Sequence, residues 1–590
     1  MKKNLFDIIV LLSFLFVSFL LCLINYDLPG VYLDAVNPDY LAMQIIRPHA
    51  YDIKWVMPFF GIPILGQLYH GTVTMFFQLP FLLILRNGSV LLLHFINSLY
   101  GSISCFFLYL LLKKLHVNRF VALGVAAMLI LSLSLNTIYR IQYYIKLPGI
   151  MFTLIAMFFL FRADEKHRKN ILLTGLFSGL AFYSYFIYIF FVPSFIISIT
   201  LIRKWEKKEL LRNIFLYLVS FLTGSYLYVV GYLNIFLSTL SYSFGLQCFL
   251  SLSFFVLGYI FLGYVLYGIM KYDFSNRKKF ITYFSIVVSV GVAFIITILI
   301  NLSGIISAIK AQTDSLSITT NGSFYYRIQL LISYTIRIIG NQEAEQLLFQ
   351  TEISKYPNVL FYVILSVSAI NLVILTFKRD VAFAKSTIVV LMFIVSFYLC
   401  SLVLISRMGN QHFVPILFML FLLLGVGVDN ILYVFRNNNV KKYVGYSLSI
   451  ILLITCLVFN TINLVSFHKE LNRTGGLHYF SSAINDLAYD ANKRYNEGEY
   501  DIYIFEKWGF IFGFNYLTSN RVECSTYLNY EAISSIIGAD KVIIICCFEE
   551  SDVDYYINKL DELNIDMERT ITPWYGRSGE LVFYSIEIRK

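Results

Sequence analysis

The chain opens with residues 1–24, MKKNLFDIIVLLSFLFVSFLLCLI, in which two lysines precede a long apolar run. A membrane-spanning helix needs about 20 apolar residues. The run is long for the apolar core of a signal peptide, and no small-x-small cleavage site follows it. We therefore expect residues 5–25 to form a retained first membrane span.

Apolar runs of this kind recur through the first 470 residues. The chain is 58% hydrophobic and 14% charged, whereas soluble domains are roughly 25% charged. Its mean hydropathy is +0.71. We predict an α-helical polytopic membrane protein of about 13 transmembrane helices, with a shorter helix at the interface over residues 71–86. The expected spans are residues 5–25, 88–112, 120–138, 147–161, 170–183, 185–202, 212–235, 248–270, 281–300, 358–377, 385–405, 412–434 and 443–466.

Charged loop residues indicate the orientation. Basic residues fall in alternate loops, beginning with Lys113, Lys114 and Arg119, and loops of this kind face the cytoplasm. We therefore expect a cytoplasmic N-terminus in the plasma membrane, and outer loops at residues 26–87 and 301–357. The net charge of +10 is spread over these loops, so membrane lipid is the expected partner and nucleic acid is not.

The tail differs from the rest of the chain. From about residue 470 it becomes polar, and strand-like runs (501–505, 541–547 and 581–588) alternate with helical stretches (479–495 and 553–563). This pattern predicts a small extracytoplasmic α/β domain. We therefore divide the chain into a membrane domain, residues 1–469, and a C-terminal domain, residues 470–590.

Two carboxylates flank the Asn37-Pro38 turn after the first span. Asp34 and Asp39 could serve as a general base and its helper, or as ligands of a divalent metal, a cofactor that the sequence neither requires nor rules out. The alternative is that Asp39 caps a helix and Asp34 is solvated.

Cations occur on the outer side, where they are disfavoured. Arg140 and Lys146, with Tyr143 and Tyr144 between them, occupy the short loop after residue 138. Arg and Lys are natural partners of a phosphate ester. The alternative is that these side chains snorkel to lipid headgroups.

A second outer turn combines Arg407 with His412, where the span at 412–434 begins. A helix N-terminus beside an arginine suits an anion, although a lone histidine at a span end is usually structural. His70, ahead of the interfacial helix, is a candidate substrate contact or a partly exposed histidine. Glu343, Glu345 and Glu352 lie in the large outer loop. Glu343 is a candidate acceptor contact, but a solvated face is the simpler expectation for all three.

Motifs for nucleotide use are missing from the sequence. It contains no Walker loop, dinucleotide fingerprint, metal-type Cys/His cluster or nucleophile elbow. We therefore expect that the chain does not consume ATP and that the energy for any chemistry arrives with the substrate.

The order and sidedness of these features resemble the GT-C glycosyltransferases of the protein O-mannosyltransferase and aminoarabinose-transferase type. The resemblance is strongest over residues 1–200, and includes the run Gly175-Leu176-Phe177-Ser178-Gly179-Leu180-Ala181. The chain departs from the family in three places. Where the family has an adjacent Asp-Glu pair in the first outer loop, this chain has Asp34 and Asp39. The family's His-Pro before the interfacial helix is His70-Gly71 here, and its Arg-Tyr in the late outer turn is Arg407-Met408.

The resemblance implies an inverting transfer of sugar from a polyprenyl-phosphate donor to a hydroxyl of a glycan, lipid or protein acceptor at the outer face. Asp34 would be the preferred base. Arg407, with His412, Arg140 or Lys146, would stabilise the phosphate. His70, Tyr143 and Glu343 would contact substrate.

The alternative is a transporter or flippase for a lipid-linked or polysaccharide substrate. Such proteins show internal repeats and polar, broken spans at mid-membrane. Here the polar residues gather on one side, which favours an enzyme.

Overall fold

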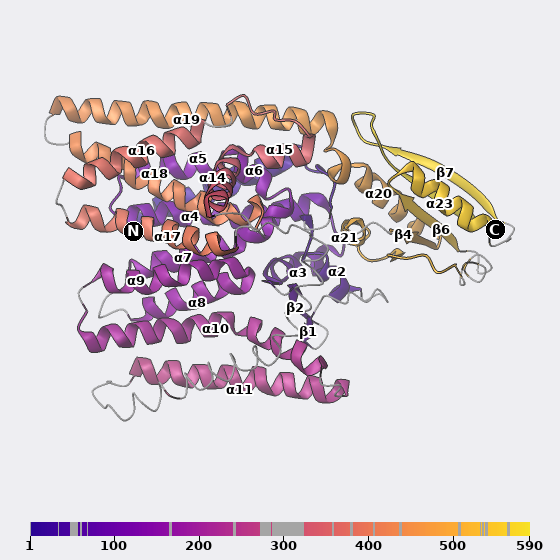
Figure 1. Cartoon of the computed structure of the whole chain (residues 1–590), viewed down its shortest axis with the longest axis horizontal. Coiled ribbons are helices and arrows are strands. Elements are labelled where there is room, and N and C mark those ends of the chain that lie inside the picture. The colour runs from indigo at the N-terminus through magenta and orange to yellow at the C-terminus, as the bar shows by residue number, and fades with distance from the viewer. Residues whose placement is uncertain are drawn as a thin grey trace.

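We describe the chain from a computed structural model (Figure 1). The structure describes residues 2–32, 35–47, 57–59, 62–67, 69–163, 168–203, 205–239, 243–271, 285, 324–356, 359–377, 381–404, 408–435, 439–505, 509–530, 533, 536, 541–562 and 567–589. A bundle of long helices forms the body, and a sheet-containing domain projects from one end of it.

Helices form the bundle, as predicted. Within the described ranges, eight helices are long and apolar enough to cross a membrane. The expected span at 281–300 lies outside the described residues. The bundle helices are α1 (Lys2–Leu23), α4 (Val90–Lys114), α5 (Arg119–Ile130), α6 (Leu133–Ile138), α7 (Leu147–Leu160), α8 (Lys169–Ser184), α9 (Val192–Ile202), α10 (Lys207–Thr239), α11 (Phe244–Lys271), α14 (Phe324–Gly340), α15 (Gln342–Phe349), α16 (Val359–Phe377), α17 (Val381–Leu404), α18 (Val414–Val434) and α19 (Asn439–Thr474).

Some expected spans are interrupted. The span predicted at 120–138 is two helices, because α5 ends at Ile130 and Ser132 caps α6 by accepting a hydrogen bond from the backbone N–H of Leu135 at 3.2 Å. Three short 3₁₀ turns precede spanning helices: η2 (Gln142–Lys146) before α7, η3 (Phe186–Phe191) before α9, and η5 (Asn410–Phe413) before α18. Two of these turns hold candidate site residues, Tyr143 and Lys146 in η2 and His412 in η5.

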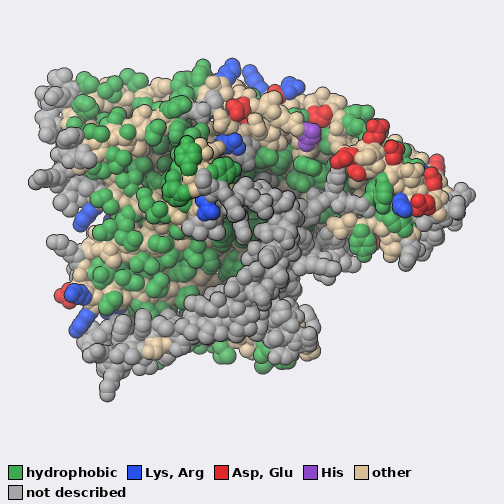
Figure 2. Space-filling view, viewed as in Figure 1, with side chains coloured by type: hydrophobic (Ala, Val, Ile, Leu, Met, Phe, Trp, Pro, Cys, Tyr) green, Lys and Arg blue, Asp and Glu red, His purple; other side chains and the backbone are tan. Residues whose placement is uncertain are grey.

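The two ends of the bundle differ in charge. At the end remote from the C-terminal domain, Lys113 of α4 pairs with Asp7 of α1 at 2.5 Å. Hydrophobic side chains dominate the described surface of the bundle, whereas most acidic side chains on the face in view lie over the C-terminal domain (Figure 2). An apolar slab between polar ends is the arrangement that a bilayer requires.

Close helix contact explains the glycine run of α8. A Cβ on Gly175 would stand 2.4 Å from the backbone oxygen of Tyr217, and one on Gly179 would stand 2.1 Å from that of Phe221. Both partners belong to α10. Small residues spaced four apart allow helix backbones to approach in this way, so the family-like run is a packing feature of the α8–α10 pair.

The segment after α1 folds back over one end of the bundle. It contains α2 (Leu41–Ile46), then a three-stranded antiparallel sheet of β1 (Met57–Phe59), β2 (Ile62–Gln67) and β3 (His70–Gly71). Helix α3 (Val73–Leu85) follows, with Pro80 inside it, where the interfacial helix was expected. The sheet was not predicted from the sequence.

The C-terminal domain contains a five-stranded sheet in the order β5-β4-β6-β8-β7. The predicted strands correspond to β4 (Asp501–Ile504), β6 (Val542–Cys547) and β8 (Leu581–Arg589), and the predicted helices to α20 (Ala483–Asn496) and α23 (Glu550–Asp561). Three elements were missed: β5 (Glu523–Ser525), β7 (Glu568–Tyr575) and α21 (Phe510–Leu517).

Both faces of the central strands are buried. Ile543, Ile545 and Cys547 of β6 pack in one cluster with Val553 and Leu560 of α23. The alternate residues, including Cys546, belong to the main core on the opposite face. Strands covered on both faces read as continuous apolar runs, as β6 does.

The domain is tightly docked on the segment that follows α1. The backbone N–H of Gly30 donates to the oxygen of Phe480 at 2.8 Å, and Asp27 pairs with Arg577 at 2.7 Å. A Cβ on Gly513 would stand 2.1 Å from the oxygen of Val31. Because the two backbones approach this closely, the domain has a fixed position over the end of the bundle that holds η2 and η5.

Candidate active site

Asp39 lies in the turn before α2 and is fully buried. Its Oδ2 accepts a hydrogen bond from the hydroxyl of Tyr144, and within the described ranges its Oδ1 has no partner. The residue that caps α2 is Tyr40, without a side-chain bond, so the helix-cap alternative for Asp39 is wrong. Asp34 lies outside the described residues, and its role stays a prediction.

Burial controls the charge of Asp39. Desolvation raises the pKa of its carboxyl to about 7, against the opposing hydrogen-bonding effects of Tyr144 and Thr74. A carboxyl of this pKa can exchange a proton near neutral pH, as general acid–base chemistry requires.

Lys146 is the second centre of the site. It is 3% exposed, and its Nζ lies 4.9 Å from the ring centroid of Tyr185. The ring of His70 stacks on the same tyrosine, with centroids 6.1 Å apart and planes 5° apart. The hydroxyl of Tyr185 lies 3.1 Å from Nε2 of His412. A buried ammonium is thus surrounded by one tyrosine and two histidines.

Both histidines are arranged as neutral groups. Burial lowers the pKa of His70 to about 4; the bond to Gly71 opposes this shift, and the charge of Lys146 adds to it. Nδ1 of His70 donates to the carbonyl of Gly71 at 3.1 Å. In η5 the backbone N–H of Gly409 donates to Nδ1 of His412 at 3.1 Å. Nδ1 of His412 also lies 3.2 Å from the carbonyl oxygen of Gly409, and its Nε2 faces the hydroxyl of Tyr185.

One short turn carries both centres. Tyr144, which holds Asp39, and Lys146 belong to η2, and Tyr143 of the same turn is also buried. The turn η2 packs against η5, the location of His412. The structure thus brings together Asp39, Lys146, His70 and His412, four of the predicted site residues. Arg407 lies outside the described residues.

Arg140 has a different position. Its Nη1 donates to the carbonyls of Asn25 and Leu28 at 3.0 and 2.9 Å, and its Nη2 to those of Leu21 and Ile24 at 2.9 Å each. These are the last carbonyls of α1 and of the turn after it, which a cation stabilises. The geometry corrects both sequence interpretations, because the side chain binds neither lipid headgroups nor an open phosphate site.

The glutamates of the large outer loop differ from one another. The backbone of Glu343 lies in α15, and its side chain is outside the described part. Glu345 is fully buried, and its Oε2 accepts from the N–H groups of Ile353 and Ser354 at 2.8 and 3.1 Å. The expected solvated face is therefore wrong for Glu345, which fixes the following loop.

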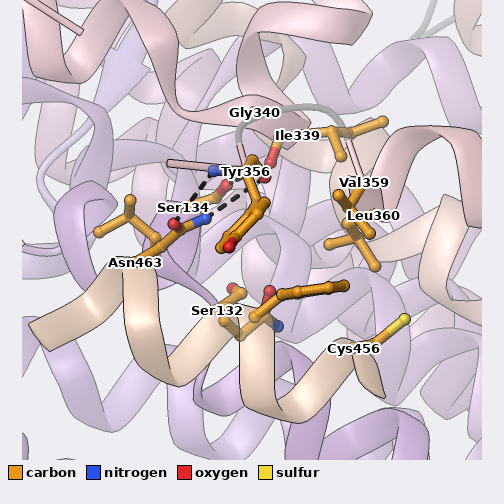
Figure 3. A pocket seen from close by; sticks show the side chains of 12 residues that line it. Ser132, Ser134, Ile339, Gly340, Tyr356, Val359, Leu360, Cys456 and Asn463 are labelled. Carbon is orange, nitrogen blue, oxygen red and sulfur yellow. Dashed lines mark hydrogen bonds between the residues drawn. The ribbon is translucent and has the colours of Figure 1, made fainter. Parts of the chain in front are cut away.

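A cavity between α6, α14, α16 and α19 does not belong to this site. It has a volume of about 20 Å³, and Ser134, Tyr356, Cys456 and Asn463 are among its lining residues (Figure 3). A volume of this size holds about one water molecule. It is too small for a sugar, and no predicted site residue lines it.

Tyr185 is the contact that sequence reasoning missed. It lies at the end of α8, where Tyr183-Ser184-Tyr185 interrupts two apolar runs. The break between the two apolar runs is visible in the sequence. Tyrosines at the end of a span are the signal that points to this contact. As a metal site, the Asp34–Asp39 pair includes a residue outside the described ranges and stays a prediction.

A family model matches one part of the chain. Residues 69–232 match the family model described as dolichyl-phosphate-mannose-protein mannosyltransferase. The matched segment contains His70, Tyr144, Lys146 and Tyr185. No curated protein sequence matches the chain.

Two solved structures are similar at low identity. The archaeal oligosaccharyltransferase AglB from Archaeoglobus fulgidus, in complex with an inhibitory peptide and a dolichol-phosphate, matches with a TM-score of 0.48 and 11% identity, over 98% of this chain and 74% of that one. The S. cerevisiae protein O-mannosyltransferase Pmt1-Pmt2 complex bound to the sugar donor matches with a TM-score of 0.31 and 19% identity, over 40% and 34%. Residues 69–232 are thus similar to the family described as dolichyl-phosphate-mannose-protein mannosyltransferase.

Proposed function

We propose that the protein transfers a sugar from a polyprenyl-phosphate carrier to an acceptor hydroxyl at the outer face of the plasma membrane. The observation that carries the proposal is the turn η2, whose Tyr144 binds the Asp39 carboxyl and whose Lys146 supplies a buried cation. A carboxyl held by this turn and a cation carried on it match the two charge changes of glycosyl transfer from a phosphate, the loss of a proton and the release of an anion.

The reaction balances with these groups. Asp34 takes the proton of the acceptor hydroxyl, whose oxygen bonds to the anomeric carbon. The bond from that carbon to the phosphate oxygen breaks, and the electron pair leaves with the polyprenyl phosphate. Attack opposite the leaving group inverts the anomeric centre. Asp39 acts beside Asp34 as the buried carboxyl that orders the turn.

The phosphate has its own group of partners. Lys146 and Arg407 neutralise the growing charge, and the Tyr185 hydroxyl, next to Lys146, is a neutral donor. Fixed donors stabilise a developing charge with little reorganisation. His70, Tyr143 and Glu343 are proposed to contact the sugar or acceptor. In the proposed orientation the basic helix ends, such as Lys113, face the cytoplasm.

Turnover of purified protein tests the proposal. We would offer a panel of polyprenyl-phosphate sugars in detergent and measure release of polyprenyl phosphate for wild type, Asp34→Asn, Asp39→Asn and Arg407→Ala. Asp7→Asn, at the remote end of the bundle, is the matched control. We expect release with one donor, and loss of turnover with retained donor binding in Asp34→Asn.

Other outcomes are equally informative. If Asp34→Asn still turns over and Asp39→Asn does not, the base is Asp39 and the reaction class stands. If no donor binds or reacts, the proposal is wrong, and transport of a lipid-linked substrate becomes the function to test.

A further inference from the structure

The uncovered face of helix α3 is entirely apolar. Its exposed residues are Phe76, Phe77, Pro80, Phe81, Leu83, Ile84 and Leu85. Ile84 is 81% exposed, the largest fraction among the described large hydrophobic side chains. A continuous apolar surface of this kind marks contact with lipid or with another protein. Because α3 packs against α4 and α8 of the membrane bundle, lipid is the expected cover.

Helix α3 ends at an exposed arginine. Arg86 follows Leu85 with a left-handed backbone, φ 57°, and its N–H donates to the carbonyl of Leu82 at 2.7 Å. Glycine is the usual residue in this conformation at a helix end, yet the chain carries a cation there. Within the described ranges, the side chain of Arg86 makes no hydrogen bond and no ion pair. Its guanidinium is therefore available to a ligand.

Two further arginines lie beside Arg86, where the C-terminal domain docks. Nη2 of Arg521 donates to Oδ1 of Asn87, the residue that follows Arg86. Two positions before Arg521, the carbonyl of Ser519 accepts a hydrogen bond from Nη1 of Arg47 at 3.0 Å. Three arginines from three segments of the chain therefore surround one turn of the docked domain.

This arginine cluster (Arg47, Arg86 and Arg521) receives no carboxylate from the described residues, because none of its members forms an ion pair with one of them. Burial, and then the charge of Arg521, lower the pKa of Arg47; Tyr495 opposes the shift and Arg86 adds to it. Like charges held together repel one another unless an anion lies between them. Phosphate is the anion whose oxygens suit several guanidinium groups at once.

We propose that the arginine cluster binds the phosphate of an anionic phospholipid, whose acyl chains pack along the exposed end of α3. Leu83, Ile84 and Leu85 directly precede Arg86, so the apolar and cationic parts of the site adjoin. A phosphate between Arg86 and Arg521 links the membrane domain to the C-terminal domain. Lipid binding at the cluster does not depend on the transferase function, and its measurement needs no sugar donor.

A tryptophan placed next to the cluster tests the proposal. Ile84→Trp is introduced into the full chain, which is reconstituted in phosphatidylcholine nanodiscs. Its fluorescence is titrated with phosphatidylglycerol or phosphatidylcholine that carries a quenching doxyl group near the head of one acyl chain. The chain without Ile84→Trp supplies the background of the four native tryptophans. The ratio of the two association constants gives the preference for the anionic lipid.

The preference is then measured in Arg86→Gln, in Arg47→Gln, Arg86→Gln and Arg521→Gln combined, and in Arg473→Gln. Arg86 has no described bond to lose, so its variant keeps the fold. Arg473→Gln is the matched control, because it removes an exposed arginine that Glu470 already pairs at 2.5 Å. We expect a preference for phosphatidylglycerol that falls by about fivefold in Arg86→Gln, the effect of one cation at a membrane surface. It should disappear in the combined variant and persist in Arg473→Gln.

Several results would overturn the proposal. A Trp at position 84 that neither lipid quenches would show that the end of α3 lies outside the lipid. Equal association of the two lipids with the native cluster, or an equal fall in Arg473→Gln, would show that the cluster does not select a lipid phosphate. If soluble polyphosphate changes the Trp emission only when Arg86 is present, while the two lipids bind equally, the cluster belongs to an anionic polymer instead.

Discussion

The hydroxyl of Tyr144 donates a hydrogen bond to Oδ2 of Asp39, a residue 105 positions earlier in the chain. This contact ties the segment after α1 to η2. Because Lys146 lies in the same turn, two residues further on, the separation of the carboxyl and the ammonium is set by the geometry of one short element. Sites held by rigid supports keep reacting groups in place.

Lys146→Met should abolish the buried charge and keep the side-chain length. If Lys146 binds the donor phosphate, the variant loses charged hydrogen bonds, and donor affinity should fall by roughly 10- to 100-fold. Equilibrium binding of the polyprenyl-phosphate sugar measures this. The control is Lys114→Met at the exposed end of α4, and unchanged affinity in folded Lys146→Met would remove Lys146 from the phosphate site.

Asp39→Asn should change how stability depends on pH. Asp39 has a pKa of about 7 in the folded protein, against an ordinary value of 3.8, so between about pH 4 and 7 the folded state binds more protons than the unfolded one. The contribution of Asp39 to the free energy of unfolding is therefore full at low pH. It is lost as the pH rises towards 7, by about 4 kcal/mol in total.

Thermal unfolding of wild type and Asp39→Asn across this range checks the sign. The Asn side chain keeps an acceptor for Tyr144 and cannot ionise, so the difference between the two proteins should change across the window and level off above it. A constant difference between pH 4 and 8 would contradict the assignment.

Arg140→Met should destabilise the protein without touching the donor site. The variant leaves four carbonyls at the end of α1 without their donors, which should cost about 3 kcal/mol or more. A lower unfolding temperature with normal donor affinity in the folded fraction is expected. Normal stability with lost donor binding would instead return Arg140 to the phosphate site.

Gly179→Ala should push α8 away from α10 and destabilise the protein. Its Cβ would stand 2.1 Å from the Phe221 oxygen, and overpacking of this kind costs about 1–3 kcal/mol. Gly263→Ala in α11 is the matched control, since nothing lies within 4 Å of its Cβ, and it should be neutral or slightly stabilising. Equal unfolding temperatures for the two variants would show that the α8–α10 contact can yield.

The sequence predicted most of the architecture because long apolar runs have one physical solution in a bilayer. It failed where the apolar pattern is weak. Strand β7 is mostly exposed and contains Pro573, as an edge strand does, so no alternation marked it.

The sequence predicted only part of the site, because it does not show which side chains bind the backbone. Cations on the outer side drew attention to Arg140 and Lys146, yet one binds backbone carbonyls and the other lies among aromatic rings. Backbone acceptors leave no trace in a sequence. The burial of Glu345, which binds the N–H groups of a loop beyond α15, was hidden for that reason as well.

The docked position of the C-terminal domain limits when the protein can complete its fold during synthesis. Gly30 and Asp27 lie near the start of the chain, and their partners Phe480 and Arg577 are made more than 400 residues later. The surroundings of Asp39 therefore cannot be assembled while the protein is still being synthesised and inserted. The loop that is made first therefore acquires its final shape only when the tail has folded onto it, and under the proposed function a chain that stalled before that point would be inactive.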